Sequence, residues 1–106
     1  MNEQNICPRF EKATELLSKR WVALIVYDLL SGPRRFGEID ADLANLSGKM
    51  LAERLKELEN EGIVKREVYP ETPVRIEYSL TEKGKALEPI LGEIAKWSSD
   101  WIELNK

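Results

Sequence analysis

The spacing of apolar residues changes in the middle of the chain, and this change limits the folds that the sequence can adopt. Before Gly62, apolar side chains recur every three or four residues, which is typical of helices with one buried face. From residue 64 to residue 80 they alternate with polar residues in two runs separated by "PETP", which predicts two strands joined as a hairpin. Helical spacing returns after Thr81. We therefore expect a mainly α fold with one β-hairpin.

Length and composition limit the organisation of the chain. Its 106 residues are enough for one modest core but not for two independently stable ones, so we expect a single domain over residues 1–106. A hydrophobic content of 42% and a charged content of 33% are typical of a soluble globular protein. The apolar runs are shorter than a bilayer requires, and residues 1–4 do not resemble a signal peptide. These features predict a cytoplasmic protein with no membrane partner.

The residue types that are missing exclude several kinds of active site. The chain has no histidine and one cysteine, Cys7, which leaves no Ser-His or Cys-His pair and no zinc site. It also lacks the glycine-rich loops that hold nucleotide phosphates. A pair of catalytic carboxylates is a minor alternative, because the acids are scattered over faces that we expect to be exposed. We therefore expect neither an enzyme nor a bound cofactor or metal.

The apolar residues before Gly62 fall into four segments with helical spacing: 8–17, 21–30, 36–43 and 47–61. The second is apolar almost throughout, which predicts a helix buried on most sides. In the fourth, Leu51, Leu55 and Leu58 form a narrow stripe that should face the core. Ser47 is expected to cap this helix and Gly62 to end it. After the hairpin, Thr81 should cap a C-terminal helical region that bends or breaks at Pro89.

The third and fourth helices, joined by a short polar turn, have the arrangement of a helix-turn-helix, and a hairpin directly after them is typical of the wing of a winged-helix domain. In such domains the second helix of the helix-turn-helix, here the fourth predicted helix, enters the DNA major groove with its N-terminal half on base edges. The residues expected to contact bases are Ser47, Lys49, Met50 and Arg54, with Lys56 on a phosphate. The alternative is a solvated face with ion pairs such as Lys49 with Glu53.

Other cations lie beside predicted helix starts and in the hairpin. Positive charge at a helix N-terminus opposes the helix dipole. A phosphate partner is therefore expected for Lys19 and Arg20 at the start of the second helix and for Arg34 and Arg35 just before the third. Their alternative role is solubility or surface pairing. Arg75 is the hairpin cation best placed to reach a minor groove or a phosphate. Because the net charge is -3, the distribution of cations must matter more than their number.

The C-terminal region carries an apolar face that a domain of this size cannot cover alone. Its members share one side of the helix: Leu87, Ile90, Leu91, Ile94, Trp97 and Trp101. Such a face is typical of a subunit interface. We expect a homodimer in which Leu91, Ile94, Trp97 and Trp101 contact the other subunit, together with Phe10 of the first helix.

Cys7 precedes Pro8, and proline is favoured at the first position of a helix, so Cys7 should be the N-cap of the first helix. There the helix dipole, with Arg9 and Lys12 close in sequence, favours the reactive thiolate form. One cysteine cannot form an internal disulfide, so oxidation would join two subunits or add a small thiol. The alternative is a small buried hydrophobic residue.

Five segments of the chain resemble the HxlR-type winged-helix transcriptional regulators of bacteria, which are distant relatives of the MarR group. They are "CPRFEKATELLSKRW", "GPRRFGEI", "KMLAERLKELENEGIVKR", "YPETPVRIEYSLTEKGKAL" and "AKW". The first and third are most similar to the thiol-sensing branch of that family. The resemblance implies a homodimeric repressor that binds a double-stranded DNA operator, controls detoxification genes and responds through one N-terminal cysteine to quinones, diamide or similar electrophiles.

The sequence departs from the family pattern at a few positions and leaves two other functions open. Gly37 and Gly48 stand where helix-favouring residues are usual, and Asp40 and Asp42 add negative charge beside the expected DNA surface. One alternative is a regulator of the same fold that binds a noncovalent ligand, with a purely structural Cys7. The other is a protein-interaction module that does not bind DNA.

Overall fold

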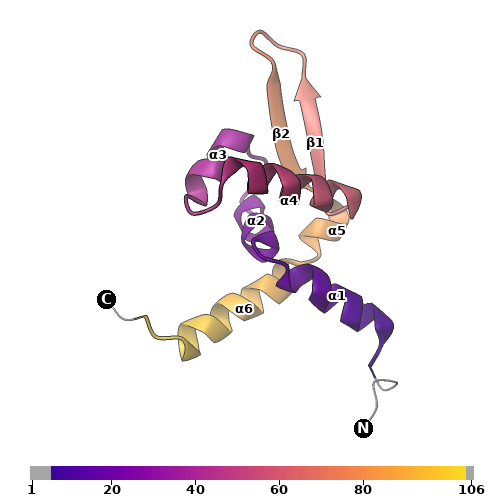
Figure 1. Ribbon diagram of the computed structural model, residues 1–106, viewed down its shortest axis with the longest axis vertical. Helices are drawn as coiled ribbons and strands as arrows, with labels where there is room; N and C mark the ends of the chain where they lie inside the picture. Colours follow the sequence, from indigo (N-terminus) through magenta and orange to yellow (C-terminus); the bar gives the residue numbers. More distant parts are fainter. Residues whose placement is uncertain (1–5, 105–106) are drawn as a thin grey trace.

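The computed structural model describes residues 6–104. Figure 1 shows a body formed by α2, α3 and α4, with a hairpin rising from one end and two helices, α1 and α6, projecting from the other end in different directions. The elements are α1 (Pro8–Ser18), α2 (Val22–Leu29), α3 (Phe36–Asp42), α4 (Gly48–Asn60), β1 (Val64–Tyr69), β2 (Arg75–Leu80), α5 (Glu82–Lys85) and α6 (Glu88–Trp101). This order confirms the mainly helical winged helix-turn-helix that the sequence predicts.

The helix ends follow the capping signals in the sequence. The Ser47 hydroxyl accepts a hydrogen bond of 3.1 Å from the Met50 amide and thereby caps α4. Gly62, just beyond α4, has a φ of 74°, a conformation that glycine adopts without steric cost. Thr81 caps α5 by accepting a 3.1 Å bond from the Gly84 amide. The C-terminal region then breaks before Pro89, which lies in the first turn of α6.

The second helix begins later than its apolar residues predict. Trp21 has a φ of 79°, a left-handed conformation that is unusual for a bulky side chain, and α2 starts only at Val22. Lys19 and Arg20 therefore lie in the turn between α1 and α2. They are not in the first turn of a helix, so the argument from the helix dipole does not apply to them.

The core lies between α2, α3, α4 and the base of the hairpin. All three members of the predicted α4 stripe are buried, and they pack against Ile25 of α2 and Ile39 of α3. Replacing a fully buried leucine such as Leu55 by alanine typically costs about 2 to 5 kcal/mol of stability, so this stripe holds α4 firmly on the body. The opposite side of α4 is thereby fixed toward solvent.

The hairpin is anchored to the body at its base. Its strands pair antiparallel, with Val64 opposite Leu80 at the buried base and Tyr69 opposite Arg75 near the turn. Arg34, just before α3, exchanges two backbone hydrogen bonds of 2.9 and 2.8 Å with Tyr78 of β2. The chain segment that leads into the helix-turn-helix is thus part of the same small sheet as the wing.

The helices α1 and α6 make the molecule extended. Its radius of gyration is 15.8 Å, whereas a compact domain of this length has a radius of about 13 Å. The two helices leave large apolar side chains in solvent, as described below. No helix within residues 6–104 is both long enough and apolar enough to cross a membrane.

Candidate DNA interface and sensor helix

Five of the ten residues that the sequence assigns to DNA lie on α4 or at its N-cap, and three of these are exposed. Ser47, Lys49 and Lys56 are exposed, and Met50 is half-buried at the edge of the core. Within residues 6–104 neither Lys49 nor Lys56 has an ion-pair partner, and the Lys49–Glu53 pair of the alternative interpretation does not form. Both ammonium groups are therefore available for an anion outside the chain.

Arg54 has a different environment from the one that base reading requires. Its side chain is only 13% exposed. Nε donates a 2.8 Å hydrogen bond to the Arg20 carbonyl, and a terminal nitrogen lies 3.3 Å from the Glu57 carboxylate. Glu57 in turn pairs with Lys19 at 3.2 Å. The guanidinium thus fastens α4 to the turn between α1 and α2, and it would have to leave these partners to contact a base.

Arg20, in the same turn, is exposed and lies over the Trp21 ring, 5.0 Å from its centroid. Together with Lys19 it adds positive charge beside α4. The sequence suggested these two cations for a different reason, namely their place at a helix start. Their link to α4 through Arg54 depends on a contact between residues far apart in the chain, which no local pattern indicates.

Arg34 and Arg35 are adjacent in the sequence but have opposite environments. The Arg34 guanidinium lies between two acids, 3.6 Å from Asp28 and 3.4 Å from Asp42. Burial raises the pKa of Asp28, and the neighbouring Asp42 carboxyl raises it further. Arg35 instead uses its backbone amide to donate a 2.8 Å bond to Glu38, and its side chain is exposed. Arg35 is therefore open to a phosphate, whereas Arg34 already joins α2 to α3.

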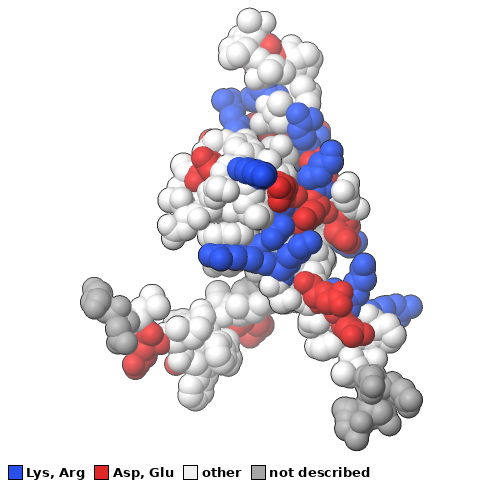
Figure 2. All heavy atoms as spheres, viewed as in Figure 1, with Lys and Arg blue, Asp and Glu red and all other residues white. Residues whose placement is uncertain are grey.

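Charged side chains of both signs lie along this side of the molecule. Figure 2 shows basic side chains in an interrupted band from the hairpin, across α4, to the junction of α1 and α2, with acidic side chains between them. The wing cation Arg75 is among those with acidic partners: Glu71 and Glu77 lie 2.8 and 2.6 Å from its nitrogens. Many of the acidic side chains on this side thus pair with a nearby cation, and the cations without such a partner stay exposed.

Cys7 is the N-cap of α1, as its position before Pro8 predicts, and its thiol is free and exposed. This exposure contradicts the alternative in which it is a buried hydrophobic residue. An apolar groove of ≈ 610 Å³ runs along the same helix. Ala13, Leu16 and Leu17 form one wall of this groove, opposite Ile63 and Leu87.

The expected dimer surface is mostly present on α1 and α6. Phe10 is 65% exposed, Ile94 52%, Trp97 58% and Trp101 73%, values that a lone chain in water would not favour. Leu91 is an exception and corrects the prediction: it is 4% exposed because it packs into the core of its own chain. It can support an interface from beneath but offers little surface to one.

One part of this apolar surface was not evident from the sequence. The second helix was expected to be buried on most sides, yet Leu24 and Tyr27 are each about half exposed. They border a shallow hollow of ≈ 180 Å³ with Ile94 and Ala95 of α6. A continuous apolar segment cannot indicate which of its faces is left uncovered, because that depends on where α6 docks.

Comparison with known proteins agrees with this geometry. Residues 16–106 match the model of the HxlR-like helix-turn-helix family. The uncharacterized HTH-type transcriptional regulator YvaP of Bacillus subtilis (strain 168) is 71% identical over 103 residues, which are 97% of this chain and 95% of YvaP. The HTH-type transcriptional regulator YodB of the same organism is 51% identical over 98 residues, 92% of this chain and 88% of YodB.

Solved structures of two regulators are also similar. Reduced YodB has a TM-score of 0.83 at 50% identity and covers 95% of this chain and 99% of its own. Diamide-treated YodB (0.77, 50% identity, 94% and 99% coverage) and quinone-bound YodB (0.78, 46%, 90% and 100%) have the same fold. The redox regulator HypR in its oxidized form has a TM-score of 0.86 at 36% identity, with coverage of 92% and 100%. The chain therefore belongs to the HxlR-like helix-turn-helix family of transcriptional regulators.

Proposed function

We propose that residues 1–106 act as one domain of a homodimeric, cytoplasmic DNA-binding repressor that leaves its operator when Cys7 reacts with an electrophile. The observation that carries this proposal is the position of α1. Its N-terminus holds the exposed Cys7, and the turn at its other end is bonded to α4 by Arg54. One helix therefore connects a reactive group to the element that reads DNA. The genes under control are, by the family resemblance, detoxification genes.

The DNA contacts are assigned from the position of each side chain and from how firmly its charge is held by other groups of the chain. Ser47, Lys49 and Met50 read base edges from the N-terminal half of α4, where the recognition helix of such domains meets the major groove. Phosphate contacts are provided by Lys56, Arg20 and Arg35, which have no acidic partner within residues 6–104. Lys19 and Arg75 add two more when a phosphate replaces the carboxylate of Glu57 or Glu71. Arg54 and Arg34 contribute by holding α4 and the wing in place, since both guanidinium groups already have partners within the chain.

The dimer is formed by α1 and α6. Phe10, Ile94, Trp97 and Trp101 become buried between the subunits, with Leu24 and Tyr27 at the edge of this surface. A twofold dimer presents two copies of α4 to half-sites about one helical turn apart, so a modest shift between subunits moves both reading helices out of register.

Two kinds of reaction at Cys7 have this effect. With a quinone, the Cys7 thiolate attacks a ring carbon and forms a carbon–sulfur bond. The ring takes up one proton from solvent, and the product is a hydroquinone thioether. Diamide accepts two electrons and two protons as two thiols, Cys7 and either the second subunit's Cys7 or a small thiol, become a disulfide. The relative YodB has been solved in diamide-treated and quinone-bound forms, which supports both reactions here.

The test combines operator selection with oxidant treatment. Duplexes that bind the wild-type protein would be selected from random DNA, and binding to the selected duplex would be followed as salt, diamide and dithiothreitol are added. We expect a dimer by light scattering, binding that weakens linearly with log salt, and release by diamide that dithiothreitol reverses. Failure to enrich any sequence would favour a protein-interaction module, and binding that diamide leaves unchanged would favour a noncovalent inducer.

A further inference from the structure

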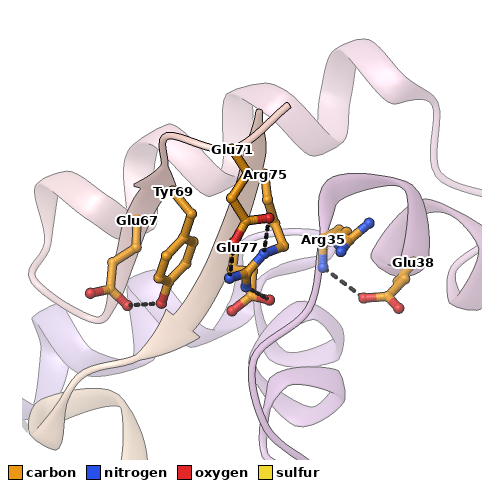
Figure 3. Close-up of polar contacts among 7 residues, drawn as sticks. All are labelled: Arg35, Glu38, Glu67, Tyr69, Glu71, Arg75 and Glu77. Carbon is orange, nitrogen blue, oxygen red and sulfur yellow. Dashed lines mark hydrogen bonds and ion pairs between the residues drawn. The ribbon is translucent and has the colours of Figure 1, made fainter. Parts of the chain in front are cut away.

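The side chain of Arg75 in the wing makes four contacts with three residues of its own hairpin, and Figure 3 shows these residues near the guanidinium. Nε and one terminal nitrogen donate to the two carboxylate oxygens of Glu71, at 3.2 and 2.8 Å. The other terminal nitrogen donates to Glu77 at 2.6 Å. The guanidinium carbon lies over the Tyr69 ring, 3.9 Å from the ring centroid. The charge of the best placed cation of the wing is therefore already paired with two carboxylates before any DNA arrives.

The two acids are not equivalent. Glu77 lies on β2 and its side chain is 24% exposed, whereas Glu71 lies in the turn between the strands and is 53% exposed. Glu71 also forms a bidentate contact, in which each carboxylate oxygen accepts a hydrogen bond from a different guanidinium nitrogen. This is the geometry in which an arginine binds a phosphate. Of the two carboxylates, Glu71 is thus the one that a phosphate can replace.

A second cation adds to the positive field at this point. Hydrogen bonds from Arg75 lower the pKa of Glu71, and the charge of Arg35, before α3, lowers it further. Figure 3 shows Arg35 beside the pair, on the chain segment that is bonded to β2. The Glu71 carboxylate therefore lies in the field of two arginines, one from the hairpin and one from the segment before α3.

We propose that Glu71 occupies the place on Arg75 that a DNA phosphate takes in the complex, so that the wing binds DNA by exchanging one carboxylate for one phosphate. Glu77 and Tyr69 keep the guanidinium in position during the exchange. A wing of this kind adds little to random encounters with DNA, because its cation is already neutralised. It contributes once α4 has docked and brings a backbone phosphate to the same spot.

This inference rests on the proposed DNA-binding function, and Glu67 provides a matched control. Glu67 is on the same hairpin but bonds the Tyr69 hydroxyl at 3.2 Å and has no contact with Arg75. Glu71→Gln and Glu67→Gln change the net charge equally. Binding of both variants, of wild type, of Arg75→Ala and of the double variant Glu71→Gln/Arg75→Ala would be measured on a fluorescent random-sequence duplex over a range of salt concentrations.

We expect Glu71→Gln to bind on the order of threefold to tenfold more tightly than Glu67→Gln and to steepen the salt dependence of log affinity by up to about 0.9, the value for one added phosphate contact. The gain should disappear in the double variant, because it requires Arg75. Glu71 is exposed in a turn, so these substitutions should leave the melting temperature unchanged, and thermal unfolding would check this.

Three results would overturn the inference. Equal gains for Glu71→Gln and Glu67→Gln would mean that only net charge matters. A gain that survives in the double variant would mean that Glu71 acts elsewhere. If wild type and all variants fail to bind the duplex even at low salt, the DNA-binding function itself fails, and the exchange at Arg75 fails with it.

Discussion

The helix-turn-helix with its wing and the pair of helices α1 and α6 expose opposite kinds of side chain. Along α4 and the hairpin most of the long exposed side chains are charged, although Val68 and Val74 are also half exposed, and Arg54 and Arg75 are bonded to acids or carbonyl groups of the chain. On α1 and α6 the exposed groups are aromatic and aliphatic, with Trp97 and Trp101 more than half exposed. The charged half is organised by contacts within the chain, whereas the apolar half lacks a cover that a second chain can provide.

This difference between the two halves indicates how each can select a partner, by charge in one half and by shape in the other. In the charged half, internal pairing separates the cations: Lys49 and Lys56 lack acidic partners in the described residues and are free for an outside anion, while Arg34 and Arg54 have such partners. In the apolar half, nothing is selected by charge, and complementarity to the second subunit must set the geometry. The two halves meet at the α1–α2 turn, where Arg54 binds the Arg20 carbonyl.

The largest effect is expected from charge placed in the apolar half. Trp97→Glu should give monomers, because the side chain would bring an unpaired carboxylate into the subunit interface. Loss of the linked second half-site should weaken binding to a two-half-site duplex about 100-fold or more. Light scattering and a DNA titration measure the two effects. Ser99→Glu, also on α6 and exposed, is the control, and similar behaviour of both variants would argue against this interface.

A smaller effect is expected from the unpaired cations of the charged half. If Lys49 reads a base, Lys49→Ala should lose about 1 to 3 kcal/mol of discrimination between selected and random duplexes. Lys56→Ala should weaken binding to both duplexes alike, because a phosphate contact carries no sequence information. Parallel titrations on the two duplexes measure this. Equal losses on both for Lys49→Ala would remove its base-reading role.

The junction of the halves is tested by Arg54→Ala. Because Arg54 donates to a carbonyl and a carboxylate while mostly buried, its removal should cost about 1.5 to 3 kcal/mol of stability and weaken both duplexes equally. A base-reading Arg54 would give the reverse result, with unchanged stability and a loss confined to the selected duplex. Denaturant unfolding together with the two titrations separates these outcomes.

The smallest effect concerns Asp28, beside Arg34. Its pKa is raised in the folded chain, so the folded state holds the proton more tightly, and ionised Asp28 costs stability above that raised pKa but not below its ordinary value of 3.8. Asp28→Asn should therefore raise the free energy of unfolding at neutral pH and leave it nearly unchanged near pH 3. A variant that is less stable than wild type at neutral pH would show that the ion pair with Arg34 dominates instead.

The local patterns predicted most of the fold. Ser47, Thr81 and Pro8 act within one helical turn of their own positions, so the sequence placed the caps and helix starts correctly. The buried stripe of α4 follows from periodicity alone. Trp21 shows the limit: an apolar residue beside an apolar run favours a helix, but its left-handed backbone depends on how α1 and α2 pack.

The candidate site was less accessible to sequence reasoning, because the availability of a charge depends on its neighbours in space. Arg34 and Arg35 look alike in the sequence, yet Asp28 and Asp42, from two other helices, hold only the first. Leu91 and Trp97 share the apolar face of α6, but only the first reaches the core. Such distinctions come from docking between elements, which spacing along the chain does not encode.

In the proposed mechanism, a reaction at Cys7, in the apolar half, controls DNA binding by the charged half. The most direct measurement is a titration of the selected duplex with wild type and Cys7→Ser, each with and without diamide, accompanied by intact mass. We expect both proteins to bind when reduced, and only wild type to gain the mass of a disulfide product and leave the DNA. If Cys7→Ser is released by diamide as readily as wild type, the claim is contradicted and a signal independent of the thiol must act.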